Sequence, residues 1–238
     1  MATRTMDRFY ETAAAFPAPE GGFAVLLDER SVKTPAERKP LVVPSAPLAE
    51  AVAQEWAEQG ETVQPQDMPL TALACTALDV ATARRADLVK GLCGYAETEL
   101  LCFRVPHPPE LTVRQHALWQ PLLDWAALRY DARLNVTTGI FPPEQPPEAF
   151  QGLEAAVRAL KAMPLAALSA AVRATGSLVL GLALVERRIG AAEAFEAAEI
   201  ETTFELEEWG EEAEAMKRRE HLRAELKAVE RFVRLLGE

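Results

Sequence analysis

Three histidines are the first candidates for metal binding, because imidazole is a common zinc ligand in proteins. His107 and His116 lie nine residues apart, and His221 is far from both. No pair has the i, i+4 spacing that places two imidazoles on one face of a helix, and no Cys-x-x-Cys pair occurs. We therefore predict surface histidines and no metal site.

The candidate nucleophiles also lack the surroundings that would activate them. Ser177 lies in ATGSLVL, which has no second glycine of a nucleophile elbow, and is interpreted as a small residue that lets helices pack closely. Cys75, Cys93 and Cys102 lie in apolar segments typical of buried, unreactive thiols. No GxxxxGK[ST] or GxGxxG phosphate-binding loop occurs. The sequence therefore predicts no catalytic residue and no cofactor.

Carboxylates are the abundant titratable groups, with 36 Asp and Glu against 25 Lys and Arg and a net charge of −11. A general acid–base pair needs two carboxylates in different environments, one of them partly buried. The sequence marks no such pair, so a solvated acidic face is the simpler interpretation. The same charge opposes binding to nucleic acid or to an anionic membrane, and it suits a partner with a basic or mixed patch.

The most acidic segment, ELEEWGEEAEA (residues 205–215), places Trp209 beside Gly210. Gly210 can end the preceding helix. The glutamates after it would then lie at the N-terminal end of the next helix, where the dipole favours them, and residues 217–219 could pair with them at i, i+4. On this interpretation the acidic run is local helix chemistry and Trp209 belongs to the core.

The glutamates before Trp209 favour a different interpretation. Four of them lie at the expected C-terminal end of a helix: Glu201, Glu205, Glu207 and Glu208. Each negative charge is unfavourable there by about 0.3–1 kcal/mol, so local stability would not select them, whereas a partner could. A tryptophan surrounded by charges at a corner between helices resembles an interface anchor. Core and interface therefore remain equal alternatives for Trp209.

The first elements along the chain are short runs of β-branched and aromatic residues bounded by glycines and prolines. This pattern predicts a small antiparallel sheet, with a hairpin whose turn is Asp28-Glu29-Arg30. One helix should follow the sheet, because Ser45 can cap its start and Gly60 can end it.

From Thr71 onward the helical period dominates. Pro121 predicts a kink or a break near Trp119 within one long helix. Residues 135–141 could form an isolated strand. The expected helices span residues 71–83, 86–95, 111–133, 147–162, 165–188, 191–209 and 211–236.

The longest apolar run, residues 165–185, is long enough to cross a bilayer. Arg173 lies inside it, and a charged side chain is costly at the bilayer centre, so we predict a buried central helix and no membrane insertion. Together the elements predict an α+β fold. Residues 1–68 form a β-rich N-terminal domain with one helix, and residues 69–238 form a helical C-terminal domain.

Eight stretches follow one another along the chain: RFYE, GGFAVLLDERSVKTP, LAEAVAQEWAEQGE, MPLTALACTALD, ETELLCFR, WQPLLDWA, TGSLVLGLAL and EEWGEEAEA. In this order, from Arg8 to Ala215, they resemble the family of assembly chaperones that guard the α subunit of F-type ATP synthase. One departure is the hairpin, which usually reads DGR in the family and here is Asp28-Glu29-Arg30. Glutamate is disfavoured at positive φ, so we expect another turn type or a slightly strained turn.

The resemblance implies a β-rich N-terminal domain, a helical C-terminal domain and a binding function without catalysis. It implies that the chain binds the free α subunit and prevents its aggregation until it pairs with the β subunit. The family's important acidic position lies near the Trp-Gly pair, so the expected partner-binding residues are Trp209, Glu205, Glu208, Glu211, Glu212 and Glu214. The positions that match family motifs, and are expected to be structural, are Trp56, Leu101, Arg104, Trp119 and Gly210.

The remaining expectations concern the setting of the protein. An odd number of widely spaced cysteines indicates a reducing compartment. The start of the sequence has neither a secretory signal nor a persuasive transit peptide, which favours the bacterial cytoplasm, or the mitochondrial matrix for a eukaryotic source. We expect a monomer when free. The alternative function is a small-molecule-binding protein or an enzyme with an acidic cleft on the same fold.

Overall fold

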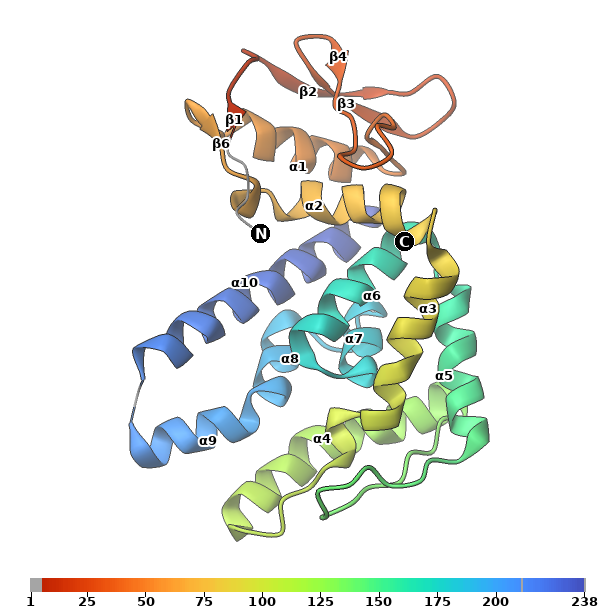
Figure 1. Cartoon of the computed structure of the whole chain (residues 1–238), viewed down its shortest axis with the longest axis vertical. Helices are drawn as coiled ribbons and strands as arrows, with labels where there is room; N and C mark the ends of the chain where they lie inside the picture. The colour runs from red at the N-terminus through yellow and green to blue at the C-terminus, as the bar shows by residue number, and fades with distance from the viewer. Residues whose placement is uncertain (1–5, 211, 238) are drawn as a thin grey trace. The chain divides into compact units, whose positions relative to one another are not determined.

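Short strands and one helix open the chain, and helices form most of the rest, in the computed structural model of the protein (Figure 1). The structure describes residues 6–210 and 212–237. The predicted α+β class is confirmed. Among the described residues, no helix is both long enough and apolar enough to span a bilayer.

The chain divides into two compact units. The first comprises residues 1–85, 162–167 and 231–238, and the second comprises residues 86–161 and 168–230. The boundary predicted between residues 68 and 69 concerns folding domains, which this grouping does not test, so it stays a prediction.

The first unit contains a four-stranded antiparallel sheet of β2 (Ala13–Pro17), β3 (Phe23–Leu27), β4 (Arg30–Ser31) and β5 (Val42–Val43). Strand β3 is central, because it pairs with each of the other three. A separate two-stranded sheet joins β1 (Met6–Asp7) to β6 (Thr62–Val63). The antiparallel sheet expected from the sequence is therefore present.

The predicted hairpin forms between β3 and β4, but its turn is only two residues long. Leu27 pairs with Arg30, so Arg30 belongs to the strand and its place in the turn was wrong. Both turn residues have positive φ, 45° at Asp28 and 68° at Glu29, which is the requirement of a type I′ turn and a strained one for glutamate. Hydrogen bonds from Thr12 N–H and Glu11 N–H to the Asp28 carboxylate hold the turn and keep the pKa of Asp28 below its usual range.

Helix α1 (Ala46–Ala57) packs against β2 and β3 (Figure 1). Ser45 caps the helix as predicted, because its side chain accepts a hydrogen bond from Leu48 N–H. The helix ends at Ala57, before the predicted stop at Gly60. The Ser45 hydroxyl also donates to the carbonyl of Leu235, in the last turn of α10 (Ala213–Leu236). The end of the described chain is therefore part of the same unit as the sheet.

A buried carboxylate on α1 fixes the start of α2 (Pro69–Thr76). Glu55 accepts hydrogen bonds from Leu70 N–H and Thr71 N–H, both at 2.8 Å. Because four helical N–H groups lack partners at any helix start, such a carboxylate replaces water that burial excludes. Burial nevertheless raises the pKa of Glu55 above its ordinary value, in spite of these hydrogen bonds.

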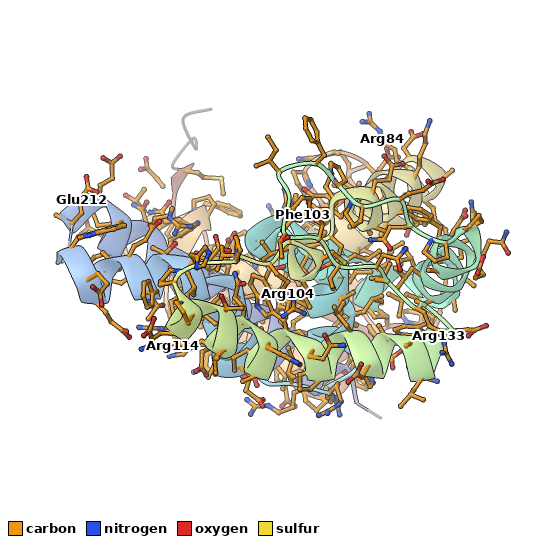
Figure 2. All side chains as sticks on the ribbon, turned by 90° about the horizontal axis from the view of Figure 1, so that it is seen from below. Arg84, Phe103, Arg104, Arg114, Arg133 and Glu212 are labelled. Carbon is orange, nitrogen blue, oxygen red and sulfur yellow. The ribbon has the colours of Figure 1, made fainter. Side chains whose placement is uncertain are left out.

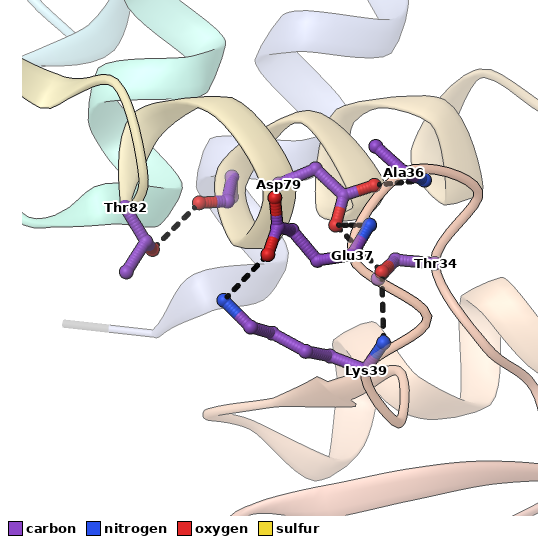
Figure 3. Close-up of polar contacts among 7 residues, drawn as sticks. Thr34, Ala36, Glu37, Lys39, Asp79 and Thr82 are labelled. Carbon is purple, nitrogen blue, oxygen red and sulfur yellow. Dashed lines mark hydrogen bonds and ion pairs between the residues drawn. The ribbon is translucent and has the colours of Figure 1, made fainter.

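A second carboxylate, Asp79, connects the loop after β4 to the π-helical turn η2 (Ala77–Ala81), as Figure 3 shows. It accepts hydrogen bonds from Thr34 Oγ1 at 2.6 Å and from Ala36 N–H at 2.8 Å. Glu37 N–H donates a third at 3.1 Å. Burial alone would raise the pKa of Asp79, but these hydrogen bonds outweigh it and lower the pKa. The contact holds an otherwise irregular loop in place.

The other helices are α3 (Arg85–Gly94), α4 (Pro109–Tyr130), α5 (Pro147–Ala159), α6 (Ala162–Thr175), α7 (Leu178–Val185), α8 (Ala191–Ala198) and α9 (Ile200–Trp209), with 3-10 turns η1 (Pro65–Asp67), η3 (Tyr95–Thr98) and η4 (Leu100–Cys102). Helix α4 continues through Pro121, so the predicted break is wrong, whereas the alternative of a kink stays a prediction. Residues 135–141 form no strand: only Thr137 pairs, in an isolated bridge with Phe103.

Two helices expected to be continuous are each divided in two. Gly176, at φ 72°, ends α6, and Ser177 caps α7 with its side chain. Glu199 separates α8 from α9. All eight residues of α7 are buried, as are most of residues 165–185, which confirms that this apolar run lies in the core, although Arg173 within it is exposed. A Cβ on Gly181 would lie 2.6 Å from Val172 Cγ2, so α6 and α7 approach each other closely there.

Candidate functional site

The Trp-Gly pair forms a corner at the end of α9. Gly210 N–H donates to Leu206 O at 3.0 Å and closes the helix, as predicted. Its φ of 92° and ψ of 169° lie in a region that is nearly restricted to glycine. Trp209 is 81% exposed, so the interpretation of Trp209 as a core residue is wrong. The backbone at this corner presents a large apolar side chain to solvent.

The predicted acidic residues near Trp209 are exposed at the end of α9 and the start of α10. Among the residues that the structure describes, none of these four has an ion pair: Glu205, Glu208, Glu212 and Glu214. Glu211, the remaining predicted residue, lies outside the described residues. The corner is thus an exposed tryptophan surrounded by negative charge that the described chain does not neutralise.

Two of the unexplained glutamates have partners on α4. Gln115 Nε2 donates to Glu201 Oε1 at 2.7 Å, and Arg114 Nη1 pairs with Glu207 Oε2 at 2.6 Å. Glu201 also lies in the first turn of α9, where negative charge is favourable, because the helix is divided at Glu199. Partial burial, and then the nearby Glu205 carboxylate, raises the pKa of Glu201. Tertiary contacts therefore account for Glu201 and Glu207, and they leave Glu205 and Glu208 unexplained.

A buried ion pair positions the corner from the other side. Glu199, 4% exposed at the junction of α8 and α9, accepts hydrogen bonds from Arg218 Nη2 at 2.7 Å and Arg219 Nη1 at 3.0 Å. Arg219 also donates to Thr203 Oγ1 at 2.9 Å. The basic residues of α10 thus pair with Glu199, where the sequence predicted i, i+4 pairs with the glutamates after Gly210. Nothing local in the sequence distinguishes Glu199 from the exposed glutamates around it.

Two shallow hollows flank α9. One, of about 400 Å³, lies between α9, α8 and α4 and has Leu118 and Ile200 among its apolar residues and Arg114 and Glu207 at its rim. The other, of about 320 Å³, lies between α9 and α10 and includes Leu206 and Met216 with several charged residues. Both are open, with charged rims, and neither has the enclosed apolar shape of a typical small-molecule site.

The family-motif residues of the second unit pack around α4. Trp119 is buried and donates from Nε1 to Ala197 O at 2.8 Å. The Arg104 guanidinium lies 5.1 Å from the Trp119 ring centroid, and its Nη1 donates to Gln115 O at 2.9 Å. Leu101 is fully buried. Figure 2 shows Arg104 beside α4, with Arg114 toward one end of that helix and Arg133 beyond the other.

The remaining motif residue, Trp56, lies in the first unit. Its carbonyl accepts a hydrogen bond from Tyr10 Oη at 2.6 Å, and its ring lies edge-on to Tyr10, with centroids 5.7 Å apart. Trp56 therefore fixes the segment that leads into β2.

Sequence reasoning missed one polar site entirely. Glu99 is 1% exposed and accepts hydrogen bonds from Ser177 Oγ, Leu178 N–H and Val179 N–H at the start of α7. Ser177 is therefore a cap and a donor to Glu99, where the sequence indicated only a small packing residue. Burial raises the pKa of Glu99 in opposition to these hydrogen bonds. The carboxylate stabilises a helix start and reaches no cavity described above.

The described residues offer no arrangement for metal or thiol chemistry. Within residues 6–210 and 212–237, no cluster of His, Cys, Asp and Glu could hold a metal ion. Burial raises the pKa of Cys102 to about 12 and that of Cys75 to about 11, so both thiols are protonated and unreactive at neutral pH.

Comparison with known proteins gives one family. A family model described as ATP12 chaperone protein matches residues 7–127. The crystal structure of Atp12 from Paracoccus denitrificans shares 37% sequence identity, with 97% of this chain and 98% of that chain covered and a TM-score of 0.90; a single-substitution variant of it gives the same values. A crystal structure from Agrobacterium tumefaciens, described as a candidate chaperone, shares 33% identity, with 98% of this chain and 87% of that chain covered and a TM-score of 0.91.

Proposed function

The chain belongs to the ATP12 chaperone family, and on this premise we propose that it binds the free α subunit of the F-type ATP synthase during assembly of the catalytic head. An unassembled α subunit exposes the apolar surface that later meets β, and such a surface promotes aggregation. The proposed function is to cover that surface until β replaces the chaperone. The proposed setting is the bacterial cytoplasm, with a monomeric free protein and no catalysis.

The observation that carries this proposal is the exposed Trp209 at the corner of α9 and α10. Tryptophan is enriched among the residues that dominate binding energy at interfaces, and substitution of such a residue commonly costs about 2 kcal/mol or more. An indole that is 81% exposed adds almost no burial energy to the folding of the free protein. Gly210 ends α9 directly after Trp209, at backbone angles that are nearly restricted to glycine, so the indole lies at an exposed helix end. We therefore place the α-subunit contact at this corner.

The negative charges around Trp209 suit a reversible contact with the α subunit. Glu205, Glu208 and Glu212 are exposed without an ion pair among the described residues. Rim charges of this kind accelerate encounter with a basic or mixed patch and contribute less to the final affinity. The expected complex therefore forms quickly and weakens as the salt concentration rises.

The first experiment is light scattering of a purified, isolated ATP synthase α subunit with and without this protein. Suppression of aggregation near equimolar ratio, together with a complex that co-elutes in size-exclusion chromatography, would support the proposal. Continued aggregation without a complex would overturn it and leave fold as the only property shared with the family.

A charge-reversal pair tests the corner itself. The double variant Glu208→Lys, Glu211→Lys should weaken the complex by at least about tenfold and keep the wild-type melting curve. The matched control is Glu50→Lys with Glu61→Lys, which changes the net charge equally at exposed positions of the first unit. Equal binding by both double variants would remove the corner from the interface.

A further inference from the structure

Strand β2 is an edge of the four-stranded sheet. The strand order is β2-β3-β4, with β5 also on β3, so β2 pairs on one side only. Among residues 6–210 and 212–237, no strand pairs with its other side. Figure 1 shows β2 running beside β3, with α1 packed below the two strands.

The hydrogen-bond pattern identifies the groups on the free side. Asp28 N–H donates to Thr12 O at one end of the β2–β3 ladder, and Ala18 N–H donates to Gly22 O at the other. Because hydrogen-bonded and non-hydrogen-bonded pairs alternate in an antiparallel ladder, Ala14 and Phe16 bond to β3. The register agrees, since Val25, opposite Ala15, donates its N–H away from β2 to Leu41 O.

The outward-facing groups are therefore main-chain donors and acceptors. Ala13 and Ala15 each direct an N–H and a C=O to the free side, and Pro17 directs a C=O. No hydrogen bond to these N–H groups exists among the described residues. This spacing of donors and acceptors is the one that an added β-strand requires.

The edge has little protection against pairing along most of its length. Natural edges are commonly short, charged, bulged or interrupted by proline. Strands β4 and β5 have two residues each, whereas β2 has five, AAAFP, without a charge. Its register with β3 is continuous, so it contains no bulge, and its one proline is the last residue. The small alanine side chains leave the main chain accessible.

We propose that β2 is a strand-addition site for an extended segment of a partner protein, with apolar or β-branched residues bounded by lysine or arginine. The half-exposed Phe16 offers apolar contact to a neighbouring side chain on the solvent face of the sheet. The strand is flanked by exposed Glu11 and Glu20, which attract basic residues at both ends of the segment. Identifying the partner as the α subunit rests on the function proposed above.

The same flanking charges argue against a second copy of this chain as the occupant. Antiparallel pairing of two β2 strands about Ala15 would bring Glu11 of one copy close to Glu20 of the other at both ends, and like charges there are destabilising. Pro17 would face Ala13 of the other copy and would supply no N–H. The net charge of −11 on each chain adds to the repulsion.

The test uses the synthetic peptide Lys-Val-Thr-Val-Thr-Val-Lys and the full chain. Amide hydrogen exchange should show that the peptide protects the Ala13 and Ala15 N–H groups, and a peptide with glutamate at both ends should protect them less. Ala15→Pro removes one outward N–H without removing a bond to β3 and should raise the peptide Kd at least about tenfold. Ala15→Ser keeps the N–H and should stay within about twofold.

Three results would overturn the proposal. The first is that the peptide does not protect the Ala13 and Ala15 N–H groups of the wild-type chain, a result that needs no variant. Equal peptide binding by Ala15→Pro and Ala15→Ser, with unchanged melting curves, also overturns it. A wild-type dimer that Ala15→Pro dissociates makes the occupant a second copy and overturns the partner segment.

The same two variants with an isolated α subunit separate this proposal from the proposed function. Wild-type protein that binds the α subunit, with binding lost in Ala15→Pro alone, supports both. Equal binding by the two variants keeps the proposed function and overturns the identification of the α subunit as the occupant of β2. Peptide protection without any α-subunit binding supports the strand site and overturns the proposed function.

Discussion

Helices α7 and α9 belong to the same unit but are held in place by different interactions. The α7 sequence, LVLGLALV, is buried at every position, and its start is capped by Ser177 and Glu99. The α9 sequence, IETTFELEEW, buries only Ile200. Polar contacts hold α9 instead, from Arg114 and Gln115 on α4 and from Arg219 on α10.

The difference indicates that the two helices contribute unequally to the stability of their unit. Each Å² of apolar surface that α7 buries contributes about 25 cal/mol to the free energy of folding. An exposed ion pair, such as the one between Arg114 and Glu207 on α9, contributes only about 0.2–1 kcal/mol. We therefore expect α7 to open only on global unfolding and α9 to open locally. Elements that bind partners are commonly drawn from the low-stability part, and Trp209 lies at the end of α9.

The largest expected effect is the removal of a core side chain from α7. Leu180 is fully buried, so Leu180→Ala should lower the free energy of unfolding by about 2–5 kcal/mol through lost burial and a residual cavity. Leu206→Ala, the equivalent change in α9, should cost less than about 1.5 kcal/mol, because Leu206 is only partly buried. Denaturant unfolding measures both losses of unfolding free energy. Equal losses would contradict the difference drawn between the two helices.

A second expected effect is a pH dependence at the α7 cap. The folded-state pKa of Glu99 is raised above its ordinary value of 4.5, so its contribution to stability is full below that pH. It is lost as the pH rises through the folded pKa, because the unfolded chain releases the proton first.

Comparison with Glu99→Gln isolates this contribution. The difference in unfolding free energy between wild type and variant should decline above pH 4.5, by at most about 1.4 kcal/mol per pH unit. Denaturant unfolding at several pH values measures the difference. A difference that grows with pH would contradict the assigned sign.

A smaller effect is expected at the polar contacts of α9. Arg114→Gln removes the half-exposed pair with Glu207 and should accelerate amide exchange in α9 by about two- to fivefold. Arg158→Gln removes a comparable exposed pair with Glu154 on α5 and should leave exchange in α9 unchanged. Exchange in α7 should be unaffected by either variant, and acceleration there would show that the two helices open together.

The smallest effect on stability is expected at Trp209. Trp209→Ala should change the free energy of unfolding by less than about 0.5 kcal/mol, since the side chain is exposed. If the proposed contact is correct, the same variant should weaken binding to the α subunit by at least about tenfold. Calorimetry and binding on one preparation measure both. A large loss of stability would show that Trp209 supports the fold.

The features that the sequence predicted correctly are those carried by local patterns. The buried run around Leu180, the cap at Ser45 and the helix end at Gly210 each depend on neighbouring residues alone. The exposed acidic residues at Trp209 were also identified, but periodicity could not decide whether the tryptophan faced the core. Its exposure became visible only with the surrounding helices in place.

The features that the sequence missed depend on partners far apart in the chain. Glu99 meets Ser177, and Glu199 meets Arg218 and Arg219, through tertiary packing that no local pattern encodes. The divisions at Gly176 and Glu199 were missed because apolar periodicity continues across both. Each buried carboxylate resembles a surface residue in the sequence, since only the fold determines which glutamates lose their water.

The contact between Ser45 and Leu235 has a consequence for biosynthesis. A ribosome adds roughly 5–20 residues per second, so the last turn of α10 follows the end of the N-terminal segment at residue 85 by roughly 8–30 s. Throughout that interval the cap of α1 lacks its distant acceptor, and the first unit lacks residues 231–237. The strands and α1 lie within residues 6–63 and are translated long before this segment, so the first unit acquires its last contacts only when the end of α10 has been made.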